Sequence, residues 1–235
     1  MFVLEARYLA HKVPVVTKTP SKLRDFSMSD LARTKVSYFG YEFEVPWSDI
    51  DESATKVYQK RVVISFKSGL RLMFASGPPK EFVSTVLSSG KLDSRLFQQY
   101  YGDALQSDYD LTRLMLESTP DRLTLLTPKK DAVGEAMMLA IKAIAIPEDS
   151  GLFSIKTAEF KGFQYGEPQN KPKKIIVDLF ADDGDLEFMF FEHDPSPATT
   201  VAQVDRPLTV SQAEINAVIQ TTRKIRPKHD RLGAS

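Results

Sequence analysis

The sequence predicts an α+β protein in which helices pack on an antiparallel β-sheet. Several segments alternate apolar and polar residues with the two-residue period of a β-strand. Tight turn residues join neighbouring segments of this kind, and such turns connect antiparallel strands. A long central stretch instead repeats its apolar residues every three to four positions, which is typical of helices. Strands and helices are therefore separated along the chain, which favours an antiparallel sheet over a parallel, doubly wound one.

The first strand is predicted over residues 36–45. From Phe39 onward every second residue is apolar, and Gly40, Glu42 and Glu44 occupy the positions between. This alternation indicates a strand with one apolar and one polar face. The proline that follows is expected to end it, because proline cannot donate a hydrogen bond to a sheet.

A hairpin is predicted next. Apolar residues alternate over residues 62–66 and again over residues 70–74, and Ser68-Gly69 lies between the two runs. Glycine adopts the positive φ that tight hairpin turns require. The sheet is expected to break after Gly77, where two prolines follow.

Residues 79–146 are predicted to form a mostly helical block. Within it, Leu111, Leu114 and Met115 form one apolar stripe, and Ser107 is placed to cap the N-terminus of that helix.

The chain then returns to strands. One strand is expected from Phe153 to Tyr165, with a bulge or bend near Gly162 because the alternation slips there. A second hairpin is predicted where the apolar runs 175–181 and 186–191 flank a turn rich in Asp and Gly. The second of these runs is so apolar that we expect a strand buried on both faces.

The last element predicted is a helix that begins at Ser211. Glu214 stands three residues later, so the two side chains can form a capping box. Val210 and Ile215 can pack across this cap, and Ile215, Val218 and Ile219 share one apolar face.

The predicted domain organisation has three parts: an extended N-terminal arm or linker over residues 1–35, a single α+β domain over residues 36–225, and a basic tail over residues 226–235. Both ends are rich in Lys and Arg, so the body between them is acidic although the formal net charge is zero. An acidic body disfavours binding to the phosphates of nucleic acid. The basic ends are interpreted as solvated tails, with contact to an anionic membrane or to nucleic acid as the alternative.

The composition limits the possible chemistry. The chain contains no cysteine, which excludes disulfides, thiolate metal sites and cysteine nucleophiles. It has no nucleophile-elbow motif and no paired-histidine zinc motif, and the segment 88–91 lacks the glycine spacing and hydroxyl residue of a phosphate-binding loop. Of three histidines, only His193 stands beside a predicted strand. No catalytic residue, metal site or cofactor is therefore predicted.

Two groups of carboxylates leave alternatives open. Asp182, Asp183, Asp185 and Glu187 lie close together in an acidic hairpin turn, and two of them are a candidate for weak binding of a hard cation. Glu42 and Glu44 protect a solvent-facing strand from pairing in one interpretation. In the other, their separation suits a carboxylate-dependent hydrolase.

Trp47, Tyr100 and Tyr101 are the candidate contact residues, because Trp and Tyr concentrate at interfaces. The alternative for Trp47, the only tryptophan, is burial in the core.

The ten residues Tyr38–Trp47 resemble the opening strand of PsbP-like and DcrB-like domains, in which an aromatic-rich strand ends at a proline with a tryptophan close behind. The two hairpins and the C-terminal helix are similar to that layout as well, whereas the block 79–146 is longer than the family pattern. The resemblance implies an α/β/α sandwich and a non-catalytic role, often outside the cytoplasm and tethered to a membrane.

The leading hypothesis is therefore a non-catalytic binding or assembly module of a bacterial envelope, with a protein or a small ligand as partner. A carboxylate-dependent hydrolase and a small-ligand carrier are the alternatives. Nothing in the sequence predicts the oligomeric state.

Overall fold

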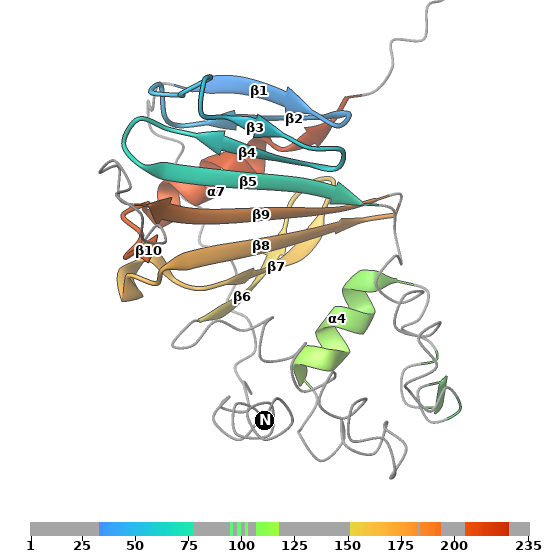
Figure 1. Ribbon diagram of the computed structural model, residues 1–235. Helices are drawn as coiled ribbons and strands as arrows, with labels where there is room; N and C mark the ends of the chain where they lie inside the picture. The colour runs from blue at the N-terminus through green and yellow to red at the C-terminus, as the bar shows by residue number, and fades with distance from the viewer. Residues whose placement is uncertain are drawn as a thin grey trace, which may run out of the picture.

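The computed structural model describes residues 33–77, 95, 98–99, 102, 107–117, 151–182, 184–193 and 205–225 (Figure 1). The strands are β1 (Thr34–Tyr38), β2 (Tyr41–Val45), β3 (Lys56–Val57), β4 (Arg61–Ser65), β5 (Leu70–Gly77), β6 (Leu152–Lys156), β7 (Lys161–Tyr165), β8 (Lys174–Ala181), β9 (Gly184–His193), β10 (Asp205–Arg206) and β11 (Arg223–Lys224). The helices with described bounds are α4 (Asp108–Glu117), the 3-10 helix η2 (Pro168–Asn170) and α7 (Gln212–Thr221).

The strands form two antiparallel sheets. The small sheet has the order β1-β2-β11. The large, eight-stranded sheet has the order β3-β4-β5-β9-β8-β7-β6, with β10 paired to β9. Every strand pair among the described residues is antiparallel, which confirms the predicted antiparallel sheet and agrees with the α+β class.

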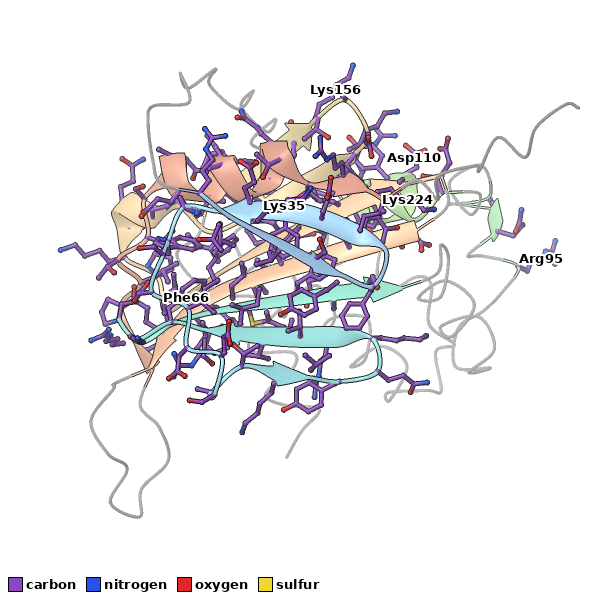
Figure 2. All side chains as sticks on the ribbon, turned by 90° about the horizontal axis from the view of Figure 1, so that it is seen from above. Lys35, Phe66, Arg95, Asp110, Lys156 and Lys224 are labelled. Carbon is purple, nitrogen blue, oxygen red and sulfur yellow. The ribbon has the colours of Figure 1, made fainter. Side chains whose placement is uncertain are left out.

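The small sheet and α7 cover the same face of the large sheet, here called the inner face. Viewed from above, the β1–β2 hairpin and α7 lie side by side over the long strands (Figure 2). Phe43 of β2 meets both Phe74 of β5 and Phe188 of β9, with ring centroids 5.1 Å apart in each case. These three side chains are buried and form the centre of the main core.

Helix α7 begins as predicted. Ser211 accepts a hydrogen bond from the Glu214 amide while the Glu214 side chain accepts one from the Ser211 amide, which is a capping box. Ile215, Val218 and Ile219 are buried against the inner face. Its sequence pattern therefore predicted both its start and its orientation correctly.

The prediction of one strand over residues 36–45 is wrong. This segment is a hairpin in which Tyr38 pairs with Tyr41, so Phe39 and Gly40 form a two-residue turn. Their φ angles of 53° and 82° are both positive, as in a type I′ turn. Alternation continued unbroken through the turn, and phenylalanine is an uncommon residue at positive φ, so the pattern looked like one long strand.

The strand predicted from Phe153 to Tyr165 is also two strands, β6 and β7, and the predicted bulge near Gly162 is absent from them. The slip in alternation is the turn itself, where the Thr157 hydroxyl accepts a hydrogen bond from the Phe160 amide at 3.0 Å. Gly162 has a different role. A Cβ atom there would lie 1.9 Å from the Asp178 carbonyl oxygen, so strands β7 and β8 can approach only at a glycine.

Both predicted hairpins are confirmed. β4 and β5 pair across Gly69, whose φ is 97°, and β8 and β9 pair with Ala181 opposite Gly184. Strand β9 is fully buried on its inner face, whereas its other face is half-buried, so burial on both faces was overestimated.

The predicted terminal segments lie mostly outside the described residues, except that β1 already begins at Thr34. Of the predicted helical block 79–146, the structure describes α4 and a few single residues. The Ser107 hydroxyl accepts a hydrogen bond from the Asp110 amide at 3.3 Å, which agrees with the predicted cap. No helix among the described residues is long and apolar enough to cross a membrane.

Replacing Gly162 with alanine is expected to cost about 3 kcal/mol of unfolding free energy, because the new methyl group meets backbone that cannot rotate away. Urea denaturation followed by circular dichroism measures this change. Gly102→Ala is the matched control, since a Cβ atom there would meet only the flexible, exposed Gln98 side chain, at 2.9 Å. An equal loss in both variants would contradict this account of β7 and β8.

Candidate functional site

The candidate site is a cavity of about 500 Å³ between the N-terminus of α4, the β6–β7 loop and the β8–β9 turn. We call it the acidic cleft. Its charged lining residues are Asp108, Asp110, Lys156, Glu159, Lys161, Asp182 and Asp185. Carboxylates outnumber lysines, so the cleft favours a ligand that carries positive charge.

Helix α4 contacts the outer face of the large sheet, opposite to α7. Tyr109 stacks on Phe163 of β7 with ring centroids 5.1 Å apart and an interplanar angle of 6°. It also meets the Phe180 ring of β8 edge-on at 6.0 Å. These contacts fix the first turn of α4, so the preceding residue, Asp108, is held at the sheet.

Asp108 forms a carboxyl pair with Asp185, the second residue of β9. Asp108 is buried, and both side chains line the acidic cleft. Burial raises the pKa of Asp185 to about 8, and the hydrogen bond and the negative charge of Asp108 add to this shift. With its pKa at about 8, Asp185 keeps its proton near neutral pH.

Two further carboxyl groups lie on the same face of the large sheet, next to Asp185 along β8 and β9. Asp178 of β8 stands directly opposite Glu187 of β9, and like charges in this arrangement are destabilising. Burial raises the pKa of Asp178 to about 7, with a further contribution from the Glu187 charge. Burial also raises the pKa of Glu187, and Lys174 partly offsets that effect. The outer face thus gathers carboxyl groups that ionise with difficulty.

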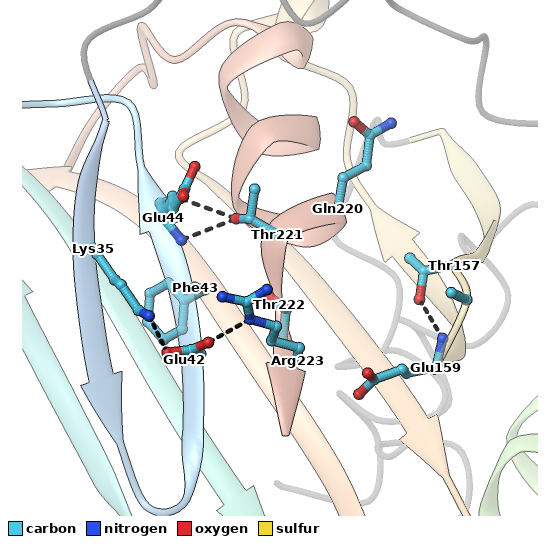
Figure 3. A pocket seen from close by; sticks show the side chains of 11 residues that line it. Lys35, Glu42, Phe43, Glu44, Thr157, Glu159, Gln220, Thr221, Thr222 and Arg223 are labelled. Atoms are coloured by element: carbon cyan, nitrogen blue, oxygen red, sulfur yellow. Dashed lines mark hydrogen bonds and ion pairs between the residues drawn. The ribbon is translucent and has the colours of Figure 1, made fainter. Parts of the chain in front are cut away.

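Glu42 and Glu44 line a different cavity of about 310 Å³, between the end of α7 and the β6–β7 loop (Figure 3). Lys35 of β1 and Arg223 of β11 both pair with Glu42, so this carboxylate links the three strands of the small sheet. Their hydrogen bonds hold the pKa of Glu42 below its ordinary value.

Glu44 pairs with Arg33 at 3.2 Å. With two cationic partners, Glu42 stays ionised and cannot act as the proton donor of a hydrolase pair. A structural role for Glu42 fits better.

Trp47, a predicted contact residue, packs at the edge of the main core. Its indole N–H donates to Glu214 at 2.9 Å, and its ring meets those of Phe66 and Phe190. Tyr100 and Tyr101 lie outside the described residues, so the contact patch stays a prediction. The large apolar side chains exposed in the described part of the chain are Val57, Tyr58 and Ile225.

The acidic turn at residues 182–187 does contribute to the site, since Asp182 and Asp185 both line the cleft. Within the described ranges, no group of three or more His, Asp or Glu side chains could hold a metal ion. His193 ends β9 opposite Asp205, and its side chain lies outside the described residues, as do Asp183 and the segment 88–91.

Sequence reasoning missed Asp108 and Asp178 as site residues. A signal existed for Asp178, because it is the only acidic residue of β8 and apolar residues flank it on both sides. Asp108 gave no such signal, since acidic residues in the first turn of a helix are common. Only the fold brings it to β9.

Stability should fall as the pH rises from about 5.5 to about 8.5. The pKa values of Asp178 and Asp185, about 7 and about 8, lie above the ordinary value of 3.8, so the folded state binds protons more tightly than the unfolded state. We expect the thermal midpoint to drop by about 5 °C over this range. Below about pH 4 stability falls again, because Glu42 and Asp51, whose pKa values are lowered, become protonated.

The double variant Asp178→Asn, Asp185→Asn should flatten this slope, whereas Glu52→Gln, at an exposed position, should not. Thermal unfolding followed by circular dichroism at three pH values measures how the midpoint changes with pH. A wild-type midpoint that stays constant or increases with pH would show that these carboxyl groups are not strained in the fold.

Comparison with known proteins found no matching family model, no matching curated protein and no matching solved structure. The resemblance of Tyr38–Trp47 to PsbP-like domains therefore stays a prediction.

Proposed function

We propose that this chain is a non-catalytic binding module whose acidic cleft receives a cationic group of a protein partner, such as a lysine or arginine side chain. The observation that carries this proposal is the Asp108–Asp185 pair. Two carboxyl groups from separate elements converge on a cavity of about 500 Å³, and one of them retains a proton near neutral pH.

A bound ammonium or guanidinium group would replace that proton. Its charge would stabilise both carboxylates in their ionised form, and its N–H groups would donate to their oxygens. Binding would thus release a proton while neutralising the repulsion among Asp108, Asp178 and Asp185. The cavity suits one long side chain or a small amine, and so favours recognition of a basic segment over recognition of a broad surface.

The non-catalytic role agrees with the PsbP-like resemblance. The α/β/α layering, the tether to an envelope membrane and the extracytoplasmic location belong to the same proposal. The carrier alternative finds less support, because charged side chains line both cavities described above.

Isothermal titration with agmatine, spermine and hexalysine at about pH 7 tests the proposal. We expect binding of at least one probe with uptake of a proton by the buffer, detected by comparing buffers of different ionisation enthalpy. Asp185→Asn should weaken binding about tenfold and remove the proton release, and Glu52→Gln should leave both unchanged. Failure of all three cations to bind the wild-type protein would overturn the proposal.

A carboxylate-dependent hydrolase is the second candidate function. Its two carboxyl groups would be those of Asp108 and Asp185, since Glu42 stays ionised. One protonated and one ionised carboxyl group in a cleft is the arrangement of a general acid and base. Ester, amide and glycoside substrates would distinguish the two functions. Turnover that disappears in both Asp108→Asn and Asp185→Asn would favour the enzyme, and its absence across the panel would favour the binding module.

A further inference from the structure

The tip of the β3–β4 hairpin exposes two neighbouring apolar side chains. Val57 is 60% exposed and Tyr58 is 44% exposed. Single exposed apolar residues are common on protein surfaces. Here two adjoin each other, in a run of six exposed residues, 56–61, which we call the hairpin tip. Water therefore covers a larger apolar surface at this tip than a single exposed side chain would present.

Backbone hydrogen bonds hold the hairpin tip in one shape. β3 pairs with β4, and the Tyr58 amide donates to the Arg61 carbonyl oxygen at 2.8 Å. β4 is itself paired with β5, and the Ser76 amide donates to the Lys60 carbonyl oxygen at 3.1 Å. β3 is the first strand in the order of the large sheet, so the tip lies at the edge of that sheet. A surface held in this way loses little conformational entropy when it binds a partner.

The hairpin tip is also positively charged. Lys56, Lys60 and Arg61 flank the two apolar residues in the chain, and the sequence contains no Asp or Glu between residues 53 and 70. The Arg61 guanidinium lies 4.7 Å from the centre of the Tyr58 ring, which places a cation beside the aromatic surface. The tip therefore differs in charge from the body of the chain, in which acidic residues predominate.

Within the described part of the chain, no carboxylate forms a salt bridge with Lys56 or Arg61. Arg61 pairs with Ala75 of β5, which pairs with Glu187 of β9, so this glutamate stands two strands away. At the strand spacing of a β-sheet the backbones of Arg61 and Glu187 are about 10 Å apart, where physiological salt weakens the attraction between charges. The positive charge of the tip is therefore available to an anion outside the protein.

This combination of groups fits the surface of an anionic lipid bilayer. Tyrosine concentrates at the level of the lipid headgroups, and an aliphatic side chain gains free energy by leaving water for the boundary of the acyl chains. Lys and Arg are attracted to anionic headgroups. Nucleic acid would also engage the cations and the Tyr58 ring, but it offers no apolar surroundings to Val57. A bilayer is therefore the partner that uses every group of the tip.

We infer that the hairpin tip docks on the surface of a lipid bilayer that carries anionic headgroups. Val57 and Tyr58 reach the boundary between headgroups and acyl chains, and the three cations of the tip contact the headgroups. This contact is peripheral and reversible, and it weakens as the salt concentration rises. It rests on the proposed function only in naming the surface through which the proposed membrane association acts, and it does not need a ligand in the acidic cleft.

Fluorescence of the full chain, labelled at the hairpin tip, tests this contact. The chain has no cysteine, so Gln59→Cys provides a single attachment point for an environment-sensitive dye such as NBD. Vesicles of phosphatidylcholine with about 30% phosphatidylglycerol should raise the NBD emission about twofold and shift it to shorter wavelength, because the dye enters the apolar boundary. Vesicles of phosphatidylcholine alone should have little effect.

Ser68→Cys, labelled in the same way, is the matched control, because Ser68 is exposed in the turn at the other end of β4. Its dye should respond to neither kind of vesicle. The control is needed because the basic ends of the chain are also attracted to anionic lipid. Vesicle binding that leaves the Gln59 dye unchanged, equal responses of the two dyes, or no vesicle binding at all would overturn the inference.

Sedimentation with the anionic vesicles measures how much the tip contributes to affinity. Lys56→Gln should weaken binding about fivefold, and Tyr58→Ser about tenfold because an interfacial aromatic ring is lost. Lys67→Gln removes another exposed lysine, next to Ser68, and should change binding less than about twofold. All three positions are exposed, so the variants should keep the fold, which circular dichroism checks. Equal losses in the two lysine variants would show that overall charge alone drives binding, which refutes a local contact.

A short single-stranded oligonucleotide, added in place of the vesicles, tests nucleic acid as the partner. A response of the Gln59 dye to the oligonucleotide but not to anionic vesicles would assign the tip to nucleic acid and overturn the membrane contact. Docking of the tip on vesicles, in a protein that binds none of the cationic probes, would retain the membrane contact and discard the proposed role of the acidic cleft. Cation binding by a protein whose tip ignores anionic vesicles would do the reverse.

Discussion

The contact of Phe43 with Phe74 and Phe188 is the interaction on which the rest of the structure depends. Phe74 and Phe188 are cross-strand neighbours at the centre of the large sheet, and Phe43 inserts from the small sheet with its ring edge-on to Phe188. Rings in such geometry contribute beyond the area that they bury. This contact sets the two sheets face to face, and α7 then fills the remaining space beside the β1–β2 hairpin.

The two faces of the large sheet differ in character because its strands alternate. Residues 186, 188 and 190 of β9 point into the apolar core, while residues 185, 187 and 189 point to the other side. On that outer face, Tyr109 packs against Phe163 and Phe180. The carboxyl groups of Asp178 and Asp185 lie on the same face. The same strands thus supply an apolar core on one side and, on the other, a face whose carboxyl groups have raised pKa values.

How well the sequence predicted each feature depended mainly on how far apart in the chain the residues that form it lie. The capping box of Ser211 and Glu214 and the Gly69 turn depend on residues a few positions apart, and both were predicted correctly. The turn at Phe39-Gly40 was missed because its residues do not form a common turn pair. Gly162 was noticed for the wrong reason, since its role depends on the Asp178 carbonyl of a neighbouring strand.

By itself, the sequence determined the apolar faces of the strands, the start and the apolar face of α7, and the antiparallel pairing of two hairpins, because period and turn chemistry are local properties. It also excluded thiol chemistry. Only the tertiary structure decided the site. Asp108 and Asp185 are far apart in the chain, and no local pattern indicates that α4 brings one to the other. The raised pKa of Asp185 arises from its burial and from the nearby Asp108, and both are properties of the folded chain alone.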